Sequence, residues 1–140
     1  IKEEFGVWTA VVITSILFLC MHTGAIQAGF IPSINVFGAG VIFAIAYYKT
    51  GNLWMPIAIH TVWNFVCSSI LYTPISGYRG FHLFHLKGTD LLAGGVNGPE
   101  ATIITTVTII IVIIGEYLFL REQVEVTQLQ QTTVKSILSE

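Results

Sequence analysis

Long apolar runs with almost no charged side chains constrain the fold of this 140-residue chain more than any other feature. The clearest run, residues 101–120, reads ATIITTVTIIIVIIGEYLFL and is apolar on every face apart from its threonines. A helix needs about 20 such residues to cross the roughly 30 Å of hydrocarbon in a bilayer. Charged residues make up 10% of the chain, whereas soluble domains average about 25%. We therefore predict an integral membrane protein.

Three further apolar segments are candidate membrane helices, namely residues 7–22, 36–48 and 53–72. The sequence therefore predicts an all-α, multi-pass transmembrane helical bundle with about four membrane helices. The first helix can continue towards Phe30, where Pro32 supplies the expected stop. Residues 1–120 form the predicted membrane core, and the polar residues 121–140 form a predicted exposed C-terminal tail.

The second of these segments contains Gly38 and Gly40. Small residues let helices approach one another closely inside a bilayer, so we expect residues 36–48 to form a tightly packed interior helix. The six lysines and arginines are scattered along the chain and form no basic patch. Nucleic-acid binding is thereby excluded, and membrane lipid and a peptide or protein substrate are the expected partners.

His60 and Asn64 are polar residues within the otherwise apolar stretch LWMPIAIHTVWNFV, residues 53–66. Residues four apart lie on nearly the same face of a helix, so the two side chains form one polar edge. Such a pair is costly inside a membrane unless it faces a cavity or has partners. The pair therefore marks a functional site, or else it only hydrogen-bonds a neighbouring helix.

His22 ends another apolar run, FLCMH, and brings a second histidine from a different predicted helix. Two histidines that converge on one place meet a requirement of zinc sites and of general acid–base sites. His22 and His60 are therefore candidate ligands of a divalent metal such as zinc.

Two other sets of polar residues admit simpler interpretations. His82 and His85 have a spacing that could hold a metal, but a glycine-rich setting favours ordinary loop histidines. Glu100 follows Gly98 and Pro99, where a carboxylate would cap the N-terminus of the last helix.

The order of the motifs resembles a known family. Phe18-Leu-Cys-Met-His22 fits an FxxxH motif, and His60-Thr-Val-Trp-Asn64 fits an HxxxN motif. Between them lie a segment of small residues and a tight TGNLW turn. This set, over roughly residues 5–70, resembles the CPBP intramembrane proteases, also called the CAAX protease (CAAX prenyl protease 2) and Abi family.

The resemblance implies a helical membrane enzyme that hydrolyses peptide bonds of prenylated CAAX-like or bacteriocin-type substrates in a bacterial cell membrane. In the family, a glutamate of an EExxxR motif and a histidine activate water, and polar side chains stabilise the oxyanion. Carried over by motif, His22 and His60 are the water-activating or metal-ligating residues. Asn64 is the oxyanion donor.

The chain departs from the family pattern at its beginning. Glu3 and Glu4 mimic the start of EExxxR, but Trp8 stands where the arginine is required. We therefore expect the carboxylate helix to lie upstream and the present chain to be catalytically incomplete. The alternatives are a non-catalytic membrane partner or bacteriocin self-immunity protein of the same fold, and a small transporter whose histidines relay protons.

Overall fold

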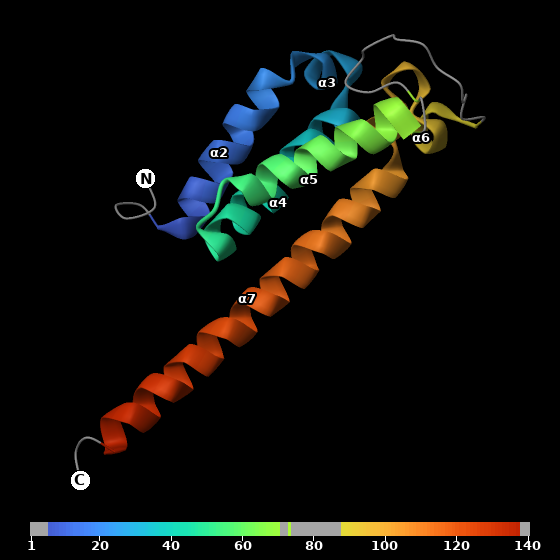
Figure 1. Cartoon of the computed structure of the whole chain (residues 1–140). Helices are drawn as coiled ribbons and strands as arrows, with labels where there is room; N and C mark the ends of the chain where they lie inside the picture. Colours follow the sequence, from blue (N-terminus) through green and yellow to red (C-terminus); the bar gives the residue numbers. More distant parts are fainter. Residues whose placement is uncertain (1–5, 71–72, 74–87, 138–140) are drawn as a thin grey trace.

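The computed structural model describes residues 6–70, 73 and 88–137, and every regular element in that part of the chain is helical. The prediction of an all-α fold is confirmed. Glu3, Glu4, His82 and His85 lie outside the described residues. Figure 1 shows the elements, which follow in the order α2 (Val7–Met21), α3 (Thr23–Ala28), α4 (Phe30–Thr50), α5 (Trp54–Phe65), the π-helical turn η1 (Val66–Ile70), α6 (Asp90–Ala93), the 3-10 turn η2 (Gly95–Ala101) and α7 (Ile103–Ile137).

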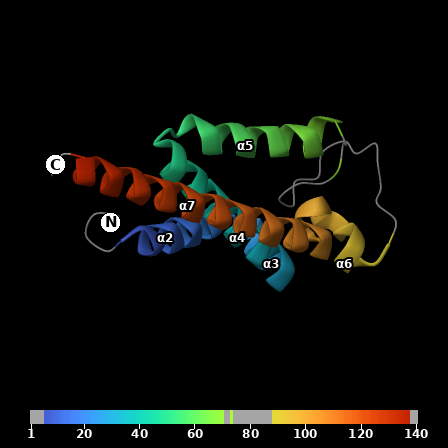
Figure 2. The same cartoon turned by 90° about the horizontal axis from the view of Figure 1, so that it is seen from below.

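Helix α4 is the central element and contacts α2, α3, α5 and α7. Figure 2 shows α5 on one side of α4 and α2 on the other. The helices α2 and α4 approach closely because Gly40 has no side chain: a Cβ atom there would lie 2.9 Å from the Cα of Ser15. Gly38 likewise faces Ile109 of α7. The predicted tight packing at the two glycines is confirmed.

Helix α2 agrees with the predicted residues 7–22 to within one residue, whereas α4 begins at Phe30 instead of residue 36. His22 has non-helical backbone angles and ends α2, and Gly29 separates α3 from α4 with a φ of 122°. The prediction that Pro32 stops the first helix is wrong, because Pro32 lies in the first turn of α4. Proline is tolerated there, because the N–H groups of the first helical turn make no hydrogen bond within the helix.

One helix in the described part of the chain is long and apolar enough to cross a membrane, namely α4 with a mean hydropathy of 1.8. Two shorter apolar helical segments, Val7–Met21 and Ile103–Phe119, accompany it. The apolar criterion therefore supports one span, and the multi-pass arrangement stays a prediction.

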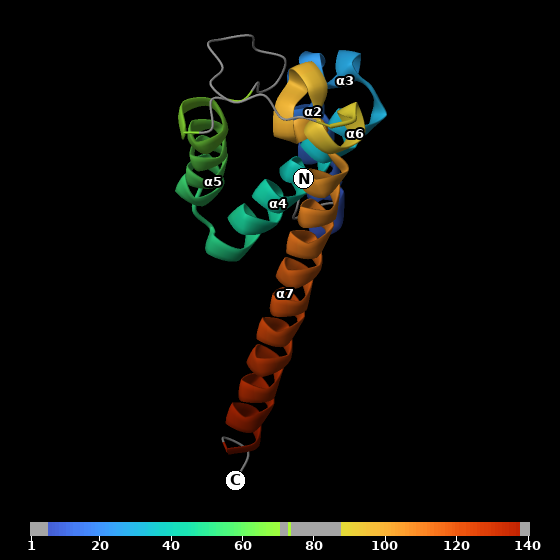
Figure 3. The same cartoon turned by 90° about the vertical axis from the view of Figure 1, so that its right-hand side faces the viewer.

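The two later helices also differ in extent from the apolar runs. The α-helical geometry of α5 ends at Phe65 and changes to a π-helical turn. Helix α7 continues to Ile137, so most of the predicted tail is helical and projects beyond the other helices in Figure 3.

Candidate active site

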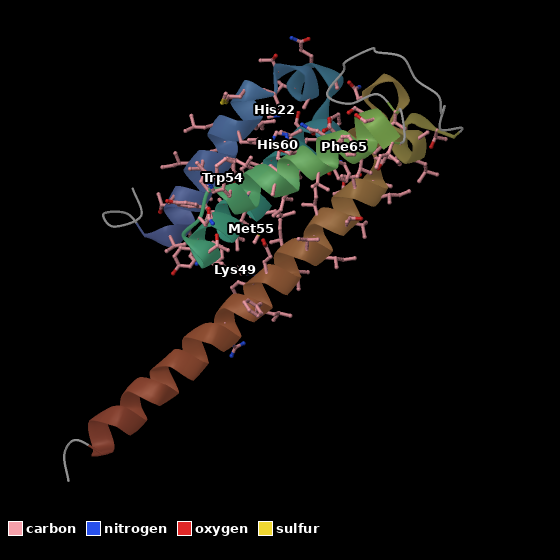
Figure 4. The ribbon with its side chains drawn as sticks, viewed as in Figure 1. His22, Lys49, Trp54, Met55, His60 and Phe65 are labelled. Atoms are coloured by element: carbon pink, nitrogen blue, oxygen red, sulfur yellow. The ribbon has the colours of Figure 1, made fainter. Side chains whose placement is uncertain are left out.

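His22 and His60 come together from two helices that lie apart in the sequence. His22 stands where α2 ends, and His60 lies within α5. Their ring centroids are 6.0 Å apart, and both residues are half-buried. Figure 4 labels both residues, His22 at the end of α2 and His60 on α5. The fold therefore places two imidazoles within reach of one small molecule.

Two phenylalanine rings fix the histidines in position. Phe18, one turn before His22, has its ring centroid 4.3 Å from that of His22 and 5.5 Å from that of His60. Phe43 of α4 packs edge-on against Phe18 at 5.3 Å and lies 5.4 Å from His60. The sequence did not identify Phe43 as a site residue, because an aromatic residue in an apolar run is indistinguishable from core.

A hydrogen bond to the backbone fixes the protonation pattern of His22. Its Nδ1 lies 2.7 Å from the carbonyl oxygen of Phe18. A carbonyl oxygen can only accept, so Nδ1 carries the proton and donates it. In the neutral imidazole, Nε2 then keeps its lone pair. His22 is thus oriented by the same helical turn that supplies the FxxxH motif.

His60 and Asn64 are hydrogen-bonded to each other across one turn of α5. Asn64 Nδ2 lies 3.2 Å from His60 Nε2. An amide nitrogen can only donate, so Nε2 of His60 is the acceptor and the neutral ring carries its proton on Nδ1. The amide of Asn64 has a second N–H for another acceptor. The predicted shared face of the two residues is confirmed.

Comparison with protein-family models matches residues 1–66 to one family, described as type II CAAX prenyl endopeptidase Rce1-like. The match covers 66 of the 140 residues. The matched segment contains His22, His60 and Asn64, and the family is one of integral membrane proteases. No curated protein and no solved structure matches the chain. The match supports the resemblance to the CAAX proteases, and the matched family is one of peptide-hydrolysing enzymes.

The predicted zinc would need more protein ligands than His22 and His60 provide. In the described ranges, no group of three or more His, Cys, Asp or Glu side chains comes together in a geometry that could hold a metal ion. Catalytic zinc sites use three protein ligands, so His22 and His60 are one ligand short. The binding of a divalent metal therefore stays a prediction.

Thr102 caps α7, because its Oγ1 accepts the backbone N–H of Thr105 at 3.1 Å. A favourable effect of the Glu100 carboxylate on the N-terminus of α7 stays a prediction. Glu100 lies in η2, and its Oε1 accepts the indole N–H of Trp63 at 3.3 Å. Glu100 is therefore linked to α5, within the HxxxN motif.

Proposed function

We propose that the protein is an intramembrane endopeptidase that hydrolyses a peptide bond of prenylated CAAX-type substrates. The observation that carries the proposal is the convergence of His22 and His60 at 6.0 Å, with the Asn64 amide bonded to His60. The match of residues 1–66 to a CAAX endopeptidase family supports the substrate class.

The two imidazoles suit the activation of a water molecule. The ring centroids of His22 and His60 lie 6.0 Å apart, and in this proposal one water molecule binds beside both imidazoles. The free lone pair on His22 Nε2 takes a proton from this water, and the resulting hydroxide attacks the scissile carbonyl carbon. The same proton then passes to the leaving amine when the C–N bond breaks.

The negative charge on the carbonyl oxygen requires a hydrogen-bond donor that is already in place. The second N–H of the Asn64 amide fulfils this role, because the first N–H is held by His60. Donors that are fixed before the reaction lower the barrier without reorganisation. His60 therefore acts in two ways in this proposal: it orients Asn64 and it completes the polar lining around the water.

The experiment uses the full-length protein in lipid vesicles with a farnesylated CAAX peptide, and mass spectrometry measures cleavage. We expect His22→Ala to reduce kcat/KM by about 10²–10⁴ and Asn64→Ala by about 10²–10³. The matched control is Val62→Ala, since Val62 lies between His60 and Asn64 on α5 but is 60% exposed. Loss of cleavage in the control alone, or unchanged cleavage in both site variants, would contradict the assignment.

The same assay separates this proposal from the other predictions. Incubation with EDTA abolishes cleavage if a divalent metal completes the site, and leaves it unchanged if the imidazoles act alone. Wild-type protein that cleaves neither the prenylated peptide nor its unprenylated form supports the non-catalytic membrane partner. The upstream EExxxR helix stays a prediction, which the codons preceding Ile1 test.

A further inference from the structure

Glu100 reaches the candidate active site from a part of the chain far away in sequence. Its Oε1 accepts the indole N–H of Trp63 at 3.3 Å, and Trp63 directly precedes Asn64 on α5. This carboxylate lies beyond the family match, which ends at residue 66. Its contact is with the HxxxN turn itself.

A buried asparagine holds the backbone of Glu100 in place. Asn35 of α4 is 3% exposed, and its Nδ2 donates to the carbonyl oxygens of Glu100 at 2.8 Å and Thr102 at 3.0 Å. Its Oδ1 accepts the hydroxyl of Thr106 at 2.7 Å. Three hydrogen bonds from one buried amide thus join η2 to the central helix and to the first turn of α7. These hydrogen bonds therefore hold the backbone at Glu100 in place.

The turn before Glu100 is closed equally tightly. Gly94 has a φ of +76°, and a Cβ atom there would overlap the carbonyl group of Gly98. The carbonyl oxygen of Pro99 accepts the hydroxyls of Thr102 at 2.9 Å and Thr105 at 2.6 Å. Contacts of the residues before and after Glu100 therefore restrict the conformation of its backbone.

Among the described residues, α5 packs mainly on α4 outside η1, and Phe18 of α2 contacts it at His60. A further contact with another element restricts rotation of the helix about its axis. Rotation of α5 would carry His60 and Asn64 away from His22 together. A hydrogen bond from Trp63 to a fixed carboxylate opposes that rotation.

We propose that Glu100 is a positioning residue of the candidate active site: through Trp63 it holds α5 at the rotation that turns His60 and Asn64 towards His22. This inference rests on the proposed function for its effect on cleavage. The structural part, the dependence of the His60–Asn64 geometry on Glu100, stands apart from activity.

The kinetic test uses the full chain and four variants. Glu100→Ala and Trp63→Phe each remove the hydrogen bond and should lower kcat/KM about tenfold, as expected for a hydrogen bond to a charged group. Glu100→Gln keeps an acceptor oxygen and should retain most of the activity. The double variant Glu100→Ala/Trp63→Phe should be no worse than either single variant, because both changes break the same contact. The control is Glu116→Ala, which changes a different half-buried glutamate that lies on α7.

Two kinetic outcomes would overturn the proposal. One is a wild-type rate in Glu100→Ala. The other is a loss in Glu100→Gln as large as in Glu100→Ala with no loss in Trp63→Phe, because the carboxylate would then act by its charge on the reaction.

A second measurement keeps failure of this inference distinct from failure of the proposed function. In ¹⁵N-labelled protein in micelles, Glu100→Ala should shift the resonances of the Trp63 indole and of the Asn64 side-chain amide. The indoles of Trp8 and Trp54 should stay unchanged. If wild-type protein cleaves no peptide but these shifts occur, the proposed function fails and the positioning role stands. Unshifted Asn64 resonances would refute the positioning role whatever the cleavage rate.

Discussion

Gly40 is the position at which a single methyl group should separate the two helices that build the candidate site. An alanine Cβ there would lie 2.9 Å from Ser15 Cα and 3.4 Å from Phe18 Cβ. Carbon atoms in good contact are about 3.5–4.0 Å apart, so α2 must move by roughly 0.6 Å or more. That movement would displace Phe18 and, with it, His22.

The matched control for Gly40→Ala is Gly115→Ala. Gly115 also lies within a helix, and a Cβ atom there would meet nothing within 4 Å. Both variants gain about 0.5–1 kcal/mol from the higher helix propensity of alanine. The overlap at Gly40 should cost about 1–3 kcal/mol, as overpacking usually does. Because both variants share the gain in helix propensity, the free energy of unfolding of Gly40→Ala should be about 1–3 kcal/mol lower than that of Gly115→Ala.

The assay is unfolding in mixed micelles by added SDS, followed by far-UV circular dichroism, with peptide cleavage measured on the same preparations. We expect Gly40→Ala to unfold at lower SDS and to cleave more slowly than wild type. Equal stability of the two alanine variants would refute the close approach of α2 and α4.

Three further predictions concern the supports of the site. Thr102→Ala should lower the free energy of unfolding by about 1 kcal/mol through loss of the α7 cap, while Thr108→Ala, whose hydroxyl bonds within its own helix, should change it little; equal effects would speak against the cap. Asn35→Ala should cost about 2–4 kcal/mol, because buried carbonyl groups lose their donors; a wild-type SDS midpoint would contradict this. Phe43→Leu should lower kcat/KM about 2- to 10-fold by removing the ring beside His60, with little change in helicity; an unaltered rate would remove Phe43 from the site.

The sequence predicted the helical class and the shared face of His60 and Asn64, because both follow from apolar composition and helical periodicity. It also predicted the close contacts at Gly38 and Gly40, since small residues in an apolar run have few other uses. These features depend on local spacing, which one sequence displays directly.

Helix ends and long-range contacts could not be obtained in the same way. The separate helix α3 and the start of α4 at Phe30 depend on backbone angles at His22 and Gly29 that apolar patterning does not encode. The sequence analysis did not single out Thr102, whose hydroxyl caps the last helix. The contact of Glu100 with Trp63 joins distant parts of the chain, and no spacing rule connects them.

The most direct test of the central claim is chemical rescue of His22. In the proposed reaction, the imidazole of His22, held by the Phe18 carbonyl, takes the proton of the attacking water. In lipid vesicles, His22→Ala should cleave a farnesylated CAAX peptide at least about 10²-fold more slowly than wild type. Added imidazole should restore part of the lost rate in this variant and leave the wild-type rate unchanged. Cleavage by His22→Ala at the wild-type rate, without imidazole, would contradict the account.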